Sequence, residues 1–185
     1  MINKTKWILI LFLFPFTAHS AEPCNPASWN VNLNQFKQLE LSYNKYVKVF
    51  NALLADHKQR PLLSKEFDRD ELAILWHIRS RRDLLQTQLE TSIKHREQLS
   101  KNAEELSKLG TQSILSANEW EKLAQSCKNA DEMANQITAE WYHITANQLA
   151  DDYNNLSSQF LGLASLYDKE ANILILSQKE EASAN

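Results

Sequence analysis

The stretch Phe36-Lys-Gln-Leu-Glu-Leu-Ser-Tyr-Asn-Lys-Tyr-Val-Lys-Val-Phe-Asn-Ala-Leu-Leu54 places its large apolar side chains three and four residues apart. This spacing puts them on one side of an α-helix, as in the seam of a coiled coil. Because several of them are aromatic, a packing of three or four helices suits them better than a two-stranded coiled coil. We predict a helix over residues 33–57, with a seam formed by Phe36, Leu39, Tyr43, Tyr46, Phe50 and Leu53.

The rest of the chain is poor in the residues that interrupt helices. Its 185 residues include 2 Gly and 4 Pro, whereas average usage would give about 13 Gly and about 9 Pro. No proline follows Pro61. A β-sandwich or barrel needs turn residues every 8–12 positions, and a nucleotide-binding loop needs clustered glycines. These classes are excluded, and long helices with few connections remain.

Two further helices are expected, over residues 69–109 and 117–177. A capping box, an acid followed three residues later by Glu, starts the first at Asp68, and Gly110 is expected to end it. A second box at Ser116 starts the other helix, and residues 129–132 could cap a fresh start within it, so that a kink there is possible. The predicted fold is all-α: an elongated, coiled-coil-like, up-down-up bundle of three long antiparallel helices, or four segments if the last helix breaks.

The seam of the last predicted helix changes register near residue 145. Its first part includes Ala134, Ile137, Trp141 and Ile144, and its second part includes Leu149, Tyr153, Leu156, Phe160, Leu163, Tyr167 and Leu174. An extra four residues between the two parts correspond to a stutter in the heptad pattern. We expect both parts to face the core, where the tryptophans that follow the leader should also lie. A ligand-stacking platform of tryptophans is the alternative.

Residues 1–20 have the pattern of a cleaved signal peptide. Lys4 and Lys6 precede an apolar run at 7–16, and Ala18-His-Ser20 offers small residues at the cleavage site. An uncleaved anchor would need about 20 apolar residues, so no integral membrane segment is expected to remain. Loss of two lysines takes the net charge from −3 to about −5, which disfavours nucleic-acid binding. The expected location is the periplasm or the exterior.

Two cysteines remain after cleavage, Cys24 and Cys127. In an oxidising compartment they most simply form one disulfide, and two separate buried thiols are the alternative. A helical hairpin about residues 111–116 would put Cys127 level with Leu99. An irregular arm over residues 21–32 would then bring Cys24 to a similar height, and the disulfide would tie this arm to the third helix.

In this register, residues 159–177 have no partner in the bundle, and we expect them to form a contact surface together with the loop near Pro61. The candidates share large apolar side chains. They are Leu62, Leu63, Phe67, Trp76, Phe160, Leu163, Leu166, Tyr167, Ile173 and Leu176. Trp76 could instead pack beneath the loop. A frayed, disordered tail is expected at 178–185.

Arg82 and Arg96 interrupt the seam of the second predicted helix. The predicted levels place Arg96 near Asp131 or Glu132, and Arg82 near Tyr142 or His143. The histidines do not have zinc-site spacing, and no Gly-x-Ser-x-Gly elbow occurs. We therefore expect no catalytic residue, metal or cofactor.

The sequence favours a non-enzymatic scaffold or adaptor of the cell envelope, such as a component of an assembly or secretion apparatus. Its partner would be an envelope protein, and homo-oligomers are compatible with the pattern. The alternative is a periplasmic holdase chaperone, which would hold unfolded chains in an apolar groove between long helices.

Overall fold

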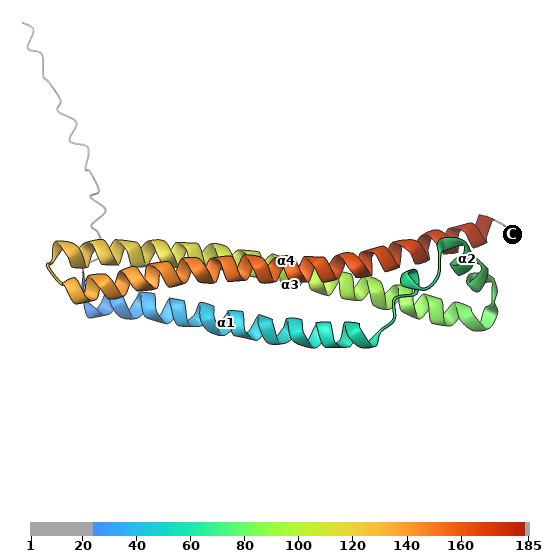
Figure 1. Ribbon diagram of the computed structural model, residues 1–185, viewed down its shortest axis with the longest axis horizontal. Helices are drawn as coiled ribbons and strands as arrows, with labels where there is room; N and C mark the ends of the chain where they lie inside the picture. The colour runs from blue at the N-terminus through green and yellow to red at the C-terminus, as the bar shows by residue number, and fades with distance from the viewer. Residues whose placement is uncertain (1–23, 184–185) are drawn as a thin grey trace, which may run out of the picture.

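The computed structural model describes residues 24–183, so the predicted signal peptide lies outside the described residues. The elements are α1 (Pro26–Gln59), a 3-10 turn η1 (Leu63–Lys65), α2 (Arg69–His77), α3 (Arg79–Asn129) and α4 (Met133–Ser183). They form an elongated bundle in which α1, α3 and α4 lie side by side, with α2 at one end (Figure 1). The predicted all-α, up-down-up bundle is confirmed.

Helix α1 begins at Pro26, within the segment predicted to be an irregular arm. The arm over residues 21–32 is therefore wrong from Pro26 onward. Asn25 is the N-cap, and its side-chain oxygen accepts hydrogen bonds from the amides of Ala27 and Ser28 at 2.9 and 3.0 Å. A proline in the first turn has no amide that needs a partner, so it begins this helix rather than excluding it. Helix α1 ends at Gln59, close to the predicted end.

The return between the two longest helices lies at residues 130–132 and not at 111–116. Helix α3 continues through Gly110 and Ser116, so the predicted ends of the second and third helices are wrong. Gly110 lies against α4, where an added Cβ would sit 3.1 Å from the Asn154 side-chain oxygen. The glycine thus allows close helix approach. The turn uses Asp131 at φ 57°, a left-handed conformation that Asp adopts more readily than most residues.

Helices α3 and α4 each contain 51 residues, or about 77 Å at 1.5 Å per residue. Helix α4 continues to Ser183, so the predicted disordered tail is wrong for residues 178–183. The predicted helix over 69–109 is divided at Ile78, which has extended backbone angles between α2 and α3. The capping box at Asp68 and Glu71 is confirmed.

A ladder of rings joins the parallel helices α1 and α4. In α1 the rings recur every seven residues, and each meets a ring of α4. We call this set the aromatic ladder; its pairs are Phe36–Tyr142, Tyr43–Tyr153, Phe50–Phe160 and His57–Tyr167, with centroids 5.0–5.4 Å apart. The heptad seam predicted for α1 therefore faces the core.

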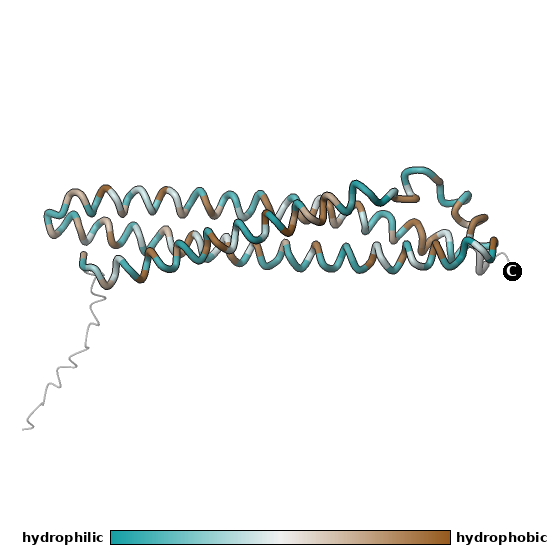
Figure 2. The backbone as a smooth tube through the Cα atoms, turned by 90° about the horizontal axis from the view of Figure 1, so that it is seen from below, coloured by the Kyte–Doolittle hydropathy of each residue, from teal (hydrophilic) through white to brown (hydrophobic). Residues whose placement is uncertain are grey.

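The ladder belongs to a hydrophobic cluster that runs along most of the bundle. A second cluster lies at the end that carries α2, with Leu72, Trp76, Leu85 and Leu174 among its buried members. Figure 2 shows hydrophobic and hydrophilic residues alternating along the long helices with the helical period. This pattern is expected when each helix buries one side.

The predicted disulfide between Cys24 and Cys127 is confirmed, with Cα atoms 4.8 Å apart. It ties the start of α1 to the end of α3, so it closes the bundle at the end opposite α2. The register that supported this prediction was wrong. The two cysteines still meet because α1 starts earlier and α3 extends farther than predicted.

Reduction of the disulfide should destabilise the bundle. The bond closes a loop with a sequence separation of 103, for which chain entropy gives about 4–5 kcal/mol. Urea unfolding with and without reductant measures the effect, and the Cys24→Ser/Cys127→Ser variant separates it from reductant effects. Coincident unfolding midpoints would contradict this role.

Substitution of the two glycines by leucine should change the stability of the protein in opposite directions. Gly162→Leu places a side chain in open space on a helix and should raise stability by about 0.5–1 kcal/mol. Gly110→Leu must displace atoms of α4 and should lower stability by about 1–3 kcal/mol. Urea midpoints of the pair measure this difference. Equal urea midpoints would show that Gly110 is not needed for the close approach of α3 and α4.

Candidate functional site

The predicted contact residues mostly lie inside the bundle. Because α3 and α4 pair along their whole length, residues 159–177 face α1, the start of α3 and α2. The prediction that this stretch lacks a partner is wrong. Buried members are Leu62, Trp76, Phe160, Leu163 and Tyr167; partly buried members are Leu63, Phe67, Leu166 and Ile173; Leu176 is exposed. These residues do not form one exposed contact surface.

Trp76 packs under the connecting loop region, which was one of its two predicted roles. It is 1% exposed, and its ring nitrogen donates a hydrogen bond to the Ser177 hydroxyl at 3.0 Å. The indole therefore fixes α2 against the last turns of α4.

A buried glutamate, which the sequence analysis did not single out, holds the loop between α1 and α2. Glu170 is 0% exposed and accepts hydrogen bonds from the amides of Leu63 and Ser64 at 2.9 and 2.8 Å. The Gln88 side chain donates another at 3.0 Å. The carboxylate thereby accepts the hydrogen bonds of amides at the start of η1 and holds this turn against α4.

The seam arginines have other partners than predicted. Arg96 contacts Asp168 at 3.2 Å, and not Asp131 or Glu132. Arg82 donates from Nε to the Trp76 carbonyl oxygen at 3.1 Å, and not to Tyr142 or His143. Both predicted contacts failed because the hairpin turn lies farther along the chain. Arg82 therefore contacts the end of α2, and Arg96 joins α3 to α4.

Two histidines enclose Tyr167 at the end of α1. The His57 ring nitrogen lies 3.2 Å from the Tyr167 hydroxyl, and the His95 ring stacks on Tyr167 with centroids 4.8 Å apart. Burial lowers the pKa of both histidines, and the charges of Lys65 near His57 and Arg60 near His95 lower it further. Asp56, 3.6 Å from His95, partly offsets this shift.

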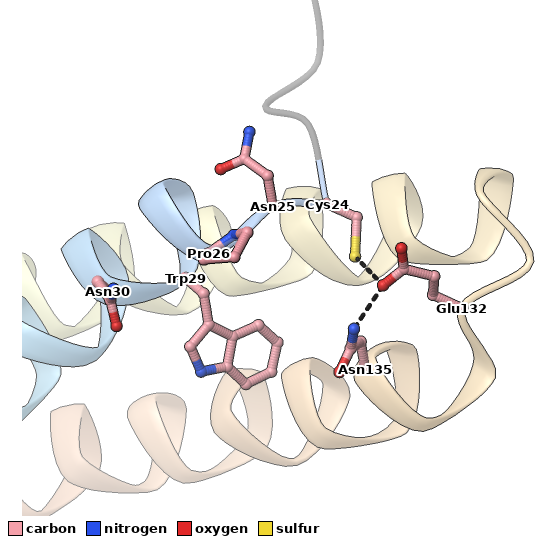
Figure 3. Close-up of a pocket in the computed structure, with 7 residues that line it drawn as sticks. All are labelled: Cys24, Asn25, Pro26, Trp29, Asn30, Glu132 and Asn135. Atoms are coloured by element: carbon pink, nitrogen blue, oxygen red, sulfur yellow. Dashed lines mark hydrogen bonds between the residues drawn. The ribbon is translucent and has the colours of Figure 1, made fainter.

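An open hollow of about 420 Å³ lies beside the disulfide, between the start of α1 and the start of α4. Figure 3 shows the Glu132 carboxylate between Cys24 and Asn135. The Cys24 sulfur is 3.2 Å from a Glu132 oxygen, but a sulfur in a disulfide carries no hydrogen to donate. Glu132 accepts a hydrogen bond from Asn135. The hollow contains no nucleophile and base in contact.

The outer face of α4 near the turn carries large apolar side chains. Met133, Ile137, Trp141 and Ile144, here called the outer stripe, are 72%, 58%, 57% and 54% exposed. Their spacing of four, four and three residues places them along one side of the helix. The last three were predicted to face the core, and this prediction is wrong.

The inner face of the same segment carries smaller side chains. Ala139 and Ala146 are both 0% exposed, and Tyr142 lies between them. The space is filled from the other helices, since Trp120 of α3 stacks on Tyr142 at 4.3 Å and Trp29 of α1 meets Trp120 at 5.2 Å. The large apolar residues of α4 are thus left outside a core that is already full.

Within residues 24–183, no three His, Cys, Asp or Glu side chains are grouped as a metal site. None of the helices in this range combines the length and the apolar character needed to cross a bilayer. The outer stripe differs from the polar surface that is expected on the outside of a helical bundle. Periodicity did reveal three of its residues, Ile137, Trp141 and Ile144, as part of a seam, but it did not reveal on which side of the helix they lie.

Comparison of the chain with protein-family models, curated proteins and solved structures gives no significant match.

The stability of the bundle should fall as the pH drops below the ordinary histidine value of 6.5. His57 and His95 have lowered pKa values in the fold, so the unfolded chain binds their protons more readily. The contribution of the neutral histidines to folding stability is therefore complete above pH 6.5. It is lost as the pH falls from 6.5 through their lowered pKa values in the folded protein. Urea midpoints between pH 7.5 and 5.5 (about one unit either side of the free histidine pKa) measure this loss.

The variant His57→Gln/His95→Gln keeps polar side chains but cannot titrate in this range. Its stability should change less with pH over the same interval. A slope equal to that of the unmodified protein would show that these histidines do not cause the acid sensitivity.

Proposed function

We propose that this protein is a non-enzymatic helical scaffold or adaptor of a cell-envelope assembly, exported to the periplasm or beyond. The observation that carries the proposal is the outer stripe: four large apolar side chains face solvent, while Ala139, Tyr142 and Ala146 lie on the core side of the same helix. Exposed apolar side chains clustered on one face are typical of protein contact sites. Trp141 is the natural anchor, because tryptophan is enriched at binding hot spots.

The disulfide supports the proposed compartment, because such bonds persist in oxidising environments. It also supports the proposed role. Cys24 and Cys127 join α1 to α3 within a few residues of the turn that leads into the outer stripe. A contact face placed on a cross-linked end loses little conformational freedom when a partner binds, and this favours affinity.

The holdase alternative is supported less well. A holdase would need a broad apolar groove between helices. The apolar hollow formed by Leu63, Phe67, Leu75, Leu84 and Leu85 with Arg81 has a volume of about 240 Å³. This volume is below the range of about 300–1,000 Å³ that is typical of small-molecule pockets, and it is far too small for an unfolded segment.

Site-specific photo-crosslinking in the native cell envelope tests the proposal. A photoreactive residue at position 137 should give one discrete crosslinked species of fixed stoichiometry, because an adaptor has a defined partner. The matched control is position 41, where Leu41 is 63% exposed on α1 outside the outer stripe. That position should give none.

Three results would contradict the proposal. They are equal crosslinking at both positions, no crosslink at either, and a ladder of many species at position 137. The last result would favour the holdase instead.

A further inference from the structure

The outer stripe is surrounded by acidic residues of its own helix. From Met133 to Asp168 the sequence contains no Lys or Arg. Glu140 lies three residues after Ile137 and four before Ile144, so it borders the outer stripe directly. Asp151 and Asp152, both exposed, follow about two turns after Ile144. This part of α4 therefore has an apolar centre and a negative border.

The neighbouring helix does not reverse this charge. On the α3 side, an open hollow of about 440 Å³ is lined by Lys122 and Lys128, but also by Glu121 and Glu140. Lys122 forms an ion pair with Glu119 at 2.7 Å. At the turn, Asp131 and Glu132 add two more exposed acids. The lysines on the α3 side are therefore matched by acids, and the acids of the turn and of α4 leave the surroundings of the outer stripe with a net negative charge.

We infer that the outer stripe binds a basic amphipathic α-helix of a partner protein, with apolar residues three and four apart and Lys or Arg beside them. This inference rests on the proposed adaptor function and specifies its partner. An amphipathic helix presents anchors at the spacing that the outer stripe itself has. The cations of such a helix would face Glu140, Asp151 and Asp152, and complementary charge favours both encounter and register.

The size of the outer stripe fits one such helix. From Met133 to Ile144 the helix rises about 17 Å, or three turns. A partner helix of about four turns covers this length. Trp141 lies between Ile137 and Ile144, so it has an apolar neighbour on each side along the helix, and an anchor that its neighbours shield from water contributes most.

A second copy of this chain fits less well. Two outer stripes placed face to face would bring Glu140 and the Asp151–Asp152 pair of each copy toward acids of the other. Like charges placed opposite one another destabilise a contact. An anionic lipid surface would be repelled for the same reason.

The test uses the full mature protein and designed peptides of about four helical turns. One peptide has Leu at the anchor spacing and Lys beside it; a second has Glu in place of Lys; a third has the Lys composition in scrambled order. Fluorescence anisotropy at low salt should show the Lys peptide binding at least about tenfold more tightly than the other two. Ile137→Asn/Trp141→Ser should abolish this preference, whereas Leu41→Asn should not.

Charge-reversal variants test the electrostatic part of the inference separately from the apolar part. The variant Glu140→Lys/Asp151→Lys should bind the Lys peptide more weakly and the Glu peptide more tightly than the unmodified protein does. The control Glu97→Lys/Glu104→Lys makes the same change in net charge on α3, at exposed positions outside the outer stripe. The control should leave the order of affinities unchanged. An equal effect of both variants would show a response to net charge and overturn the inference.

The remaining outcomes separate the two proposals. If the Lys and Glu peptides bind equally and Ile137→Asn/Trp141→Ser removes both, the adaptor surface stands and the basic partner is wrong. If the outer stripe variants change no binding, both proposals fail. Self-association that Ile137→Asn abolishes, or binding to anionic vesicles that Trp141→Ser abolishes, would overturn the basic helix in favour of that occupant.

Discussion

Rings that recur every seven residues in α1, and every seven residues from Tyr153 onward in α4, set how these two helices pack. Both helices run in the same direction, so rings spaced by seven stay level along the bundle. Tyr43 pairs with Tyr153 and Phe50 with Phe160, and each pair fills one core layer. Burial raises the pKa of Tyr153 to about 12, and its hydroxyl donates a hydrogen bond to the Leu39 carbonyl at 2.7 Å. The ladder therefore fixes both the rotation and the height of α1 against α4.

The ladder also explains the outer stripe. Near the turn, Trp29, Trp120 and Tyr142 occupy the space between the three long helices. Besides Tyr142, α4 contributes the small residues Ala139 and Ala146 to this space. Helical geometry then puts Ile137 and Trp141 on the solvent side. Solvent-facing positions of a helix usually carry polar residues, and the apolar outer face is the observation on which the proposed adaptor function rests.

The sequence predicted the helical class, the α1 seam, the disulfide and the cap at Asp68, because each depends on local spacing or on residue chemistry. It did not predict the turn. Gly110 is typical of a helix end, but here it allows α4 to approach, and this role depends on tertiary packing. Asp131, which makes the turn, carries a weak local signal. One misplaced turn shifted the register of α3 against α4, and the predicted partners of Arg96 were then wrong. The side faced by Trp141 was wrong for another reason, because periodicity shows that residues share a face but does not show which face is buried.

Hydroxyl-radical footprinting of the free protein, read by mass spectrometry, shows which side of α4 faces solvent. In the structure Met133 and Trp141 face solvent, while Trp120 and Tyr142 pack in the core. Met133 and Trp141 should be oxidised readily, whereas Trp120, which is 0% exposed, should be protected. Protection of Trp141 to the level of Trp120, together with ready oxidation of Tyr142, would show that α4 faces the other way and would contradict the account.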